Sequence, residues 1–261
     1  MGIFSDSVRQ MIKALLPNRY HPYRYLEKLA IHSSHGKVHS GPFRGMKYIT
    51  EASGSALTPK IVGTYEKELH DWIGFVASKE FDAIVDVGAA EGYYAIGFAQ
   101  LFPDSRVTAF EMDAVARERL DKLARMNGCQ DRVEVRGKCD AQELQRALRP
   151  NSLLIVDVEG DELHLLDPCL IPNLLSATIA VEVHDSLRDG CGDVLTGRFQ
   201  DSHMIRKIEA VPRDFRDYPF SSALAFLIPQ SSKREAISER PDTSPPQYWL
   251  TMIPNAQRLG V

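Results

Sequence analysis

Between Ala83 and Asp185, apolar runs of strand length alternate with stretches of helical periodicity. Strands are predicted at residues 83–87, 106–110, 132–136, 153–158 and 178–183. Strand–helix alternation of this kind is typical of a parallel sheet whose crossover helices cover both faces. The sequence therefore predicts an α/β fold built on a mostly parallel sheet.

The pattern continues more weakly after Asp185. A helix near 193–199, a strand near 204–210, a helix within 221–239 and a last strand at 248–253 would complete a seven-stranded sheet. The Pro- and Ser-rich residues 241–246 are predicted to be a connector.

The first 62 residues are predicted to form an extension, and residues 63–261 the main domain. Residues 4–16 have the spacing of an amphipathic helix, which could touch a membrane surface. Because its polar face carries only two basic residues, we expect it instead to dock on the domain or on a partner subunit of a homo-oligomer. Residues 32–58 are rich in Gly, Ser and His and predict loops around a short strand at 46–49. A further helix is predicted at 65–76.

Composition excludes several classes of protein. An apolar fraction of 44% with 25% charged residues is globular, and a net charge of −4 argues against a general nucleic-acid binder. No apolar run approaches the ~20 residues that span a bilayer, and no signal peptide is recognisable. The four cysteines form no CxxC pair. We expect a cytoplasmic protein without a transmembrane segment.

The segment DVGAAEGYY, from Asp86 to Tyr94, ends the first strand in a turn of small residues that opens a helix. Such a turn lets the backbone approach a ligand closely. It lacks the G-x-G-x-x-G spacing of dinucleotide sites. It resembles motif I of class I S-adenosylmethionine methyltransferases, and the resemblance assigns cofactor binding to Asp86, Gly88, Ala90 and Gly92.

Acidic residues end the next two strands. Glu111 follows the second strand, where two carboxylate oxygens can accept hydrogen bonds from both hydroxyls of a ribose. Asp140 follows the third strand, where it can accept from the adenine amino group or cap the following helix.

The fourth strand ends in DVEGDE and the fifth in EVHD. Together with motif I, these strings resemble the FkbM-type methyltransferases over residues 63–185. The resemblance implies a Rossmann-like class I methyltransferase fold, S-adenosylmethionine as cofactor, and O-methylation of a hydroxyl on a sugar, glycan or natural-product small molecule.

Catalytic candidates lie at the ends of the fourth and fifth strands. Ligands of open α/β sheets bind outside the carboxyl ends of the strands, where Asp157 is expected to join the cofactor site. His184 is the first candidate for the base that accepts the hydroxyl proton, with Asp185 or Glu182 orienting its ring and Asp157 as a second candidate. A divalent ion such as Mg²⁺, held by Asp157 and Asp185, is a less favoured alternative, because the histidine that flanks Asp185 weakens the resemblance to metal-dependent methyltransferases.

Two other functions remain open at this point. The chain can be a nicotinamide-dependent Rossmann oxidoreductase, which the missing fingerprint glycine disfavours. It can also be a nucleotide-binding module without catalysis.

Overall fold

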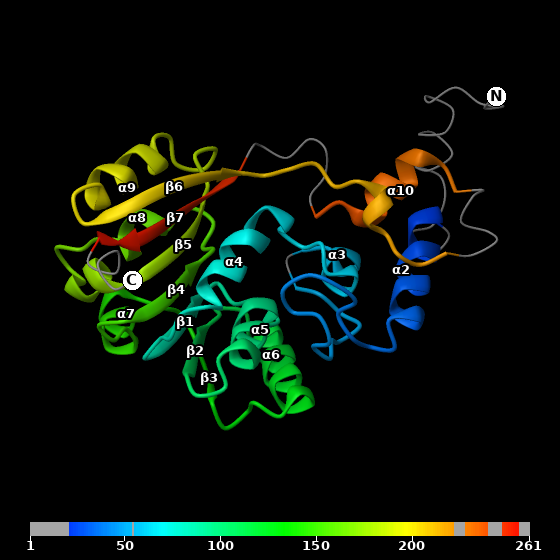
Figure 1. The fold of residues 1–261 in the computed structure, drawn as a ribbon, viewed down its shortest axis with the longest axis horizontal. Helices are drawn as coiled ribbons and strands as arrows, with labels where there is room; N and C mark the ends of the chain where they lie inside the picture. Colours follow the sequence, from blue (N-terminus) through cyan, green and yellow to red (C-terminus); the bar gives the residue numbers. More distant parts are fainter. Residues whose placement is uncertain (1–20, 54, 222–227, 240–246, 256–261) are drawn as a thin grey trace.

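Seven strands form one sheet in the order β3-β2-β1-β4-β5-β7-β6 (Figure 1). The computed structural model describes residues 21–53, 55–221, 228–239 and 247–255. The strands are β1 (Ala83–Val87), β2 (Arg106–Phe110), β3 (Val133–Arg136), β4 (Ser152–Val156), β5 (Thr178–Val183), β6 (His203–Glu209) and β7 (Tyr248–Pro254).

The strands β1 to β5 pair in parallel, and β7 runs antiparallel between β5 and β6. The chain winds outward from β1 to β3 and then returns to place β4 on the other side of β1. The β1–β4 boundary is thus the point where the strand order reverses, the usual place of a ligand site in such sheets.

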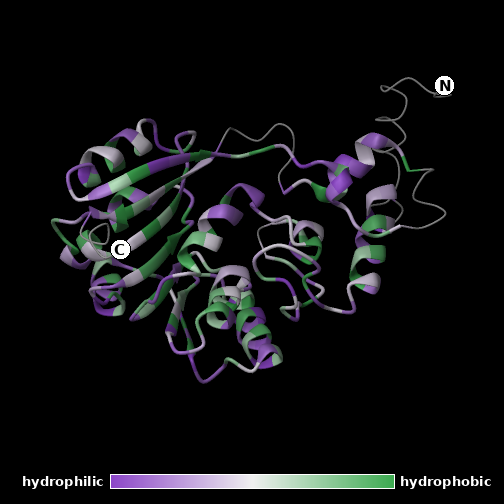
Figure 2. Cartoon of the chain, viewed as in Figure 1, coloured by the Kyte–Doolittle hydropathy of each residue, from purple (hydrophilic) through white to green (hydrophobic). Residues whose placement is uncertain are grey.

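Apolar side chains alternate between two cores along each central strand. In β4, Leu153 and Ile155 belong to one core, whereas Leu154 and Val156 belong to the other. The first core includes α4 (His70–Val76), α5 (Tyr93–Leu101) and α6 (Ala114–Asn127), and the second includes α7 (Ala141–Ala147), α8 (Glu162–Leu165) and α9 (Cys191–Phe199). Figure 2 shows the central strands mainly in the hydrophobic colour. The predicted helices on both faces are therefore confirmed.

The predicted strands correspond closely to the observed ones. Strands at 83–87, 106–110 and 178–183 have the expected bounds, and β6 and β7 lie within one residue of theirs. The prediction of 153–158 was wrong at its end: β4 stops at Val156, because Glu159 and Gly160 take positive φ values of 43° and 106° and turn the chain toward α8.

The helix predicted at 65–76 was wrong in its first half. Glu66 has φ of 44°, a 3-10 turn spans Lys67–Leu69, and α4 begins only at His70. The backbone N–H of Glu66 donates to the Glu239 carboxylate at 2.8 Å instead of to a helical carbonyl. A long-range contact thus overrides the local helical periodicity.

The region before β1 packs on the rest of the molecule. It contains α2 (Pro22–Ser33) and α3 (Leu57–Val62), and α2 packs against α10 (Gln230–Ile237), as Figure 1 shows. The strand predicted at 46–49 was wrong, since only an isolated bridge joins Lys37 and Lys47. Buried residues of this region share the first core with β1 and α5. The division at residue 62 stays a prediction.

Two sequence predictions fall outside the described residues, namely the helix at 4–16 and the connector at 241–246. In the part of the chain that is described, no helix combines the length and apolarity needed to cross a membrane.

Six strands run one way and β7 runs against them, with helices on both faces. This is the α/β, Rossmann-like class I methyltransferase fold that the sequence predicts, with its mostly parallel seven-stranded sheet, and the expected fold class is confirmed.

Candidate active site

A cavity of about 740 Å³ opens at the carboxyl ends of β1 to β5. We call its two parts the cofactor half, at the ends of β1, β2 and β3, and the acceptor half, at the ends of β4 and β5. A volume of this order suits a cofactor together with a small substrate. Six of the predicted site residues line it, namely Asp86, Gly88, Ala90, Glu111, Asp157 and His184. Gly92 is not among the lining residues and is the N-cap of α5.

Backbone packing explains the small residues of the turn after β1. A Cβ on Gly88 would lie 1.7 Å from the Asp157 carbonyl oxygen, and φ of Gly88 is 85°. A Cβ on Gly92, at φ of 98°, would lie 2.8 Å from Leu120. Ala90 carries a side chain despite φ of 47°. The two glycines thus permit close strand and helix contacts, and they bring the loop backbone to the cavity.

Asp86 is a buried carboxyl on the cavity wall. Only 2% of its surface is exposed, and its Oδ2 has no hydrogen-bond partner. Burial, the largest cause, raises the pKa of Asp86 to about 7, although a backbone hydrogen bond from Ala95 opposes the shift. A buried carboxyl with an unpaired oxygen is suited to bind a cationic ligand group.

Glu111 spans the ends of β1 and β2. Its Oε2 accepts from the Ala90 N–H at 2.8 Å, and its Oε1 accepts from the Asp113 N–H at 2.7 Å. Both oxygens are therefore fixed in place, and each retains a lone pair for a ligand hydroxyl. The arrangement fits bidentate binding of a ribose.

Asp140 is the N-cap of helix α7. Its Oδ1 accepts from the backbone N–H groups of Gln142 and Glu143 at the start of α7, both at 2.9 Å. Asp140 is not among the residues that line the cavity, whereas its neighbours Gly137, Lys138 and Cys139 are. The predicted contact with adenine is therefore not supported for this side chain.

The acceptor half brings together Asp157, Glu182 and His184. His184 Nε2 lies 3.7 Å from Asp157 Oδ1 and 3.6 Å from Glu182 Oε2. On the other side of the ring, His184 Nδ1 lies 2.6 Å from Glu162 Oε1. Glu162, which the sequence analysis did not single out, therefore orients the imidazole.

The acids around His184 raise the pKa of its imidazole. Burial would lower the pKa of His184, but the hydrogen bond to Glu162 and the negative charge of Glu182 outweigh it, so the pKa is raised above 6.5. The acids around the ring therefore stabilise the protonated form of the imidazole relative to a free histidine. The structure thus favours the cluster as a whole over the lone imidazole as the reactive centre.

Asp185 does not belong to this cluster, which corrects its prediction as a catalytic residue or metal ligand. Its Oδ2 accepts from Tyr248 Oη at 2.7 Å and its Oδ1 from the Gly192 N–H at 3.1 Å, and it does not line the cavity. β5 ends at Val183 and Asp185 begins a turn in which the backbone N–H groups of Leu187 and Arg188 bond the His184 carbonyl, so Asp185 lies beyond the strand.

A buried ion pair connects the region before β1 to the turn after it. Lys60 Nζ lies 2.5 Å from Glu91 Oε1, and the two side chains are 2% and 0% exposed. Glu91 also accepts from Tyr48 Oη at 2.7 Å and from the Ser53 N–H at 2.9 Å. Lys60 and Ser53 line the cavity, so this pair holds one wall of the site in place.

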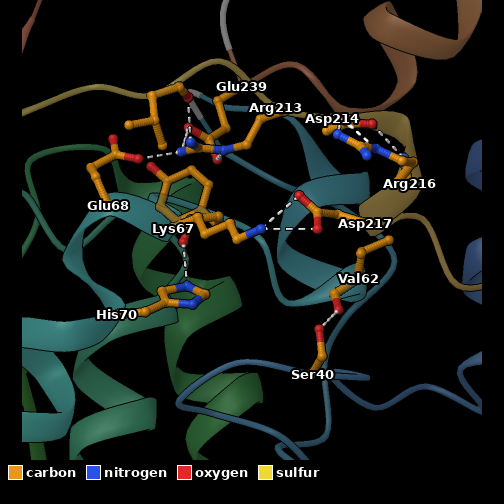
Figure 3. A network of polar contacts seen from close by, with 12 residues as sticks. Ser40, Val62, Lys67, Glu68, His70, Arg213, Asp214, Arg216, Asp217 and Glu239 are labelled. Carbon is orange, nitrogen blue, oxygen red and sulfur yellow. Dashed lines mark hydrogen bonds and ion pairs between the residues drawn. The ribbon is translucent and has the colours of Figure 1, made fainter.

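Segments from both ends of the chain close the acceptor half. Arg213 pairs with Glu68 and Glu239, each at 2.7 Å, and Lys67 pairs with Asp217, as Figure 3 shows. Glu239 in turn accepts from the Glu66 N–H, and Glu66 accepts a hydrogen bond from Tyr94 Oη. Glu66 and Glu239 line the cavity. These acids come from distant parts of the sequence, and no local motif marks them.

The acceptor half is consequently rich in buried carboxylates. Burial, together with the negative charges of Glu182 and Glu239, raises the pKa of Glu66 well above its ordinary value. Tyr93 Oη is also buried on this wall and has no hydrogen-bond partner. Its free hydroxyl is available to a polar ligand.

No family model and no curated protein matches the sequence. Solved structures with similar folds include a candidate O-methyltransferase from Klebsiella pneumoniae, with 13% identity, a TM-score of 0.46 and coverage of 96% of this chain and 97% of that one. An rRNA methylase from Streptococcus thermophilus has 13% identity and a TM-score of 0.47, covering 72% and 96%. A precorrin-6y C5,15-methyltransferase from Geobacter metallireducens has 12% identity and a TM-score of 0.45, covering 70% and 87%. At such identities no residue role is carried over to this chain.

Proposed function

We propose that this protein is an S-adenosylmethionine-dependent methyltransferase that methylates a hydroxyl on a sugar, glycan or natural-product small molecule. The observation that carries the proposal is the pair formed by Asp86 and Glu111 on one cavity wall. Asp86 offers an unpaired buried oxygen to a cation, and Glu111 offers two fixed oxygens to a diol.

The cofactor carries both groups in one molecule. Its ammonium would lie against Asp86, and its ribose hydroxyls would donate to Glu111. Gly88 lets the loop backbone pass close to the ligand. A nicotinamide dinucleotide also has a ribose diol, but it has no ammonium group to satisfy Asp86.

The acceptor is proposed to be a small polyhydroxylated molecule. The buried carboxylates of Glu66 and Glu182 and the free hydroxyl of Tyr93 can hydrogen-bond several hydroxyl groups. The choice of oxygen as the methylated atom rests on the resemblance of the DVEGDE segment to FkbM-type enzymes.

In the proposed reaction, the acceptor oxygen attacks the methyl carbon in line with the sulfur. When bound, S-adenosylmethionine would supply an activated methyl group whose C–S bond would break as the new C–O bond forms, giving S-adenosylhomocysteine. The cluster of Asp157, Glu182 and His184 would take the hydroxyl proton and pass it to solvent. Positioning of the two reactants can supply roughly 7–11 kcal/mol, and assistance to proton loss about 10²- to 10⁴-fold in rate.

Calorimetric titration with S-adenosylmethionine, S-adenosylhomocysteine and NAD tests the proposal. Binding of both adenosyl ligands and no binding of NAD is the expected result. Tight binding of NAD alone would establish the oxidoreductase alternative. Cofactor binding with no methyl transfer to any member of a panel of sugars and phenols would favour the non-catalytic module.

Removal of the cluster side chains is expected to separate binding from turnover. His184→Ala and Asp157→Ala should each bind S-adenosylhomocysteine as the wild type does, since neither side chain is proposed to hold the cofactor alone, and each should lose about 10²- to 10⁴-fold in kcat. The exposed His164, whose side chain is 70% accessible, supplies the matched control His164→Ala. Unchanged kcat in both cluster variants would refute their role.

Cofactor affinity is expected to fall as the pH falls below 7. Because burial raises the pKa of Asp86 to about 7, the carboxyl is protonated in acid and must lose that proton to hold an ammonium group. The dissociation constant should rise about 25-fold from pH 7.5 to pH 5.5, by proton linkage at a single group. Calorimetry across this range measures the effect, and Asp86→Asn should bind weakly with little pH dependence. An equally steep profile in Asp86→Asn would assign the titration to another group.

A further inference from the structure

We propose that Asp157, Glu182 and His184 bind a divalent transition-metal ion on the wall of the acceptor half. The three side chains offer one ligand atom each, and these atoms lie within 4.8 Å of one another. Two of the ligands are almost wholly buried, with side-chain exposures of 3% for Glu182 and 2% for His184, and Asp157 is open to the cavity at 35%.

The spacing of the ligand atoms suits a metal ion better than hydrogen bonds. His184 Nε2 lies 3.7 Å from one carboxylate oxygen and 3.6 Å from the other, beyond hydrogen-bond distance. Because all three atoms lie within 4.8 Å of one another, a cation in their plane and equally far from each would lie no more than roughly 2.4 Å away, close to the usual bond lengths of about 2.0–2.2 Å for nitrogen and oxygen ligands of zinc.

The opposite side of the imidazole has the partner that metal-bound histidines usually have. His184 Nδ1 lies 2.6 Å from Glu162 Oε1, which also accepts from the Gly160 N–H at 3.0 Å. Glu162 is completely buried. A carboxylate that accepts from Nδ1 fixes the tautomer in which Nε2 presents its lone pair, and here that lone pair faces the two acids.

Ligand chemistry narrows the identity of the ion. Mg²⁺ and Ca²⁺ prefer sites made only of oxygen ligands, whereas one imidazole with two carboxylates suits Mn²⁺, Fe²⁺ or Zn²⁺. Three protein ligands leave coordination positions open toward the cavity. Such an ion would lower the pKa of an acceptor hydroxyl and hold its oxygen. This catalytic role rests on the proposed function, whereas the binding of the ion itself does not rest on it.

Titration of the metal-free full-length protein with Mn²⁺, without cofactor or acceptor, tests the site. Calorimetry is expected to give one ion per chain with a dissociation constant of about 100 μM or below. Glu182→Gln and His184→Gln should each weaken binding at least about tenfold, as expected from the loss of a ligand. His164→Ala should bind as the wild type does, because its ring is exposed and outside the cluster. Thermal denaturation verifies that each variant is folded.

Spin-echo spectroscopy of bound Mn²⁺ supplies a second readout, the coupling to an imidazole nitrogen, which should disappear in His184→Gln. No binding up to 1 mM Mn²⁺ or Zn²⁺ would overturn the site. If Asp185→Asn lost ion binding while Glu182→Gln retained it, the ion would lie at the Asp157–Asp185 pair, and the proposed site would also be overturned. Ion binding without methyl transfer would refute the proposed function alone, and methyl transfer by a protein that binds no ion would refute this site alone.

Discussion

Replacing Glu111 by alanine is expected to raise the dissociation constant for S-adenosylhomocysteine about 100-fold or more. Each hydrogen bond to a charged acceptor contributes roughly 1.5–3 kcal/mol, and Glu111 is proposed to accept two from the ribose. The substitution also leaves the Ala90 N–H, which donates to Glu111 at 2.8 Å, without its partner. Calorimetric titration of the folded variant measures the loss.

Two further variants separate the ribose contact from general effects of charge. Glu118→Ala removes an exposed acid from α6 and should leave the dissociation constant unchanged. Glu111→Gln keeps one acceptor oxygen but turns the other into a donor, so an intermediate loss is expected. Wild-type affinity in Glu111→Ala would remove Glu111 from the cofactor site and with it the main support for the proposed function.

The cofactor half could be predicted because its features are local in the sequence. The apolar run of β1 ends at Val87 and is followed at once by the small-residue turn, and β2 ends one residue before Glu111. In a parallel sheet the carboxyl ends of all strands meet at one edge. Knowing where each strand ends therefore places Asp86 and Glu111 together without knowledge of any long-range contact.

The acceptor half could be predicted only in part, because its remaining residues come from distant segments. Glu66 belongs to the loop before α4, and Glu239 follows α10, more than 170 residues later. The Glu66 N–H donates to Glu239, and Arg213 pairs with both Glu239 and Glu68, so these contacts join the two segments. Ion pairs between such distant positions leave no periodic pattern. Asp185 was misplaced for a simpler reason, because β5 ends at Val183 and Asp185 lies in the turn that follows it.

The region before β1 was the least predictable. Residues 32–58 have a loop-like composition, yet Phe43, Met46 and Tyr48 are buried in the first core. Phe43 lies against Gly97 of α5, where a Cβ would come within 2.5 Å of its ring. Tertiary packing thus orders a segment that has almost no regular secondary structure of its own.

Replacing Lys60 by methionine is expected to destabilise the protein by about 3–5 kcal/mol, because it leaves the buried Glu91 carboxylate without its counter-charge. The Lys60–Glu91 pair is 2% and 0% exposed, whereas the Lys67–Asp217 pair is 46% and 29% exposed. Lys67→Met, the matched control, should therefore cost less than about 1 kcal/mol. Urea denaturation followed by circular dichroism measures both losses.

The pH dependence and the double variant test the cause of this loss. Burial raises the pKa of Glu91, but the charge and the hydrogen bond of Lys60 outweigh burial and hold this pKa below its ordinary value. Wild-type Glu91 therefore stabilises the fold at pH values above its unfolded pKa. This stabilisation is lost as the pH falls through the folded pKa. In Lys60→Met only the hydrogen bonds from Tyr48 and Ser53 still oppose burial, so the pKa of Glu91 is expected to rise. The carboxyl should then take up a proton in mild acid, and the difference in stability from wild type should shrink from pH 8 to pH 5. Lys60→Met combined with Glu91→Gln should recover most of the stability, since no buried charge then remains. Equal losses for Lys60→Met and Lys67→Met, or a loss that grows in acid, would show that the pair does not hold this wall of the cavity.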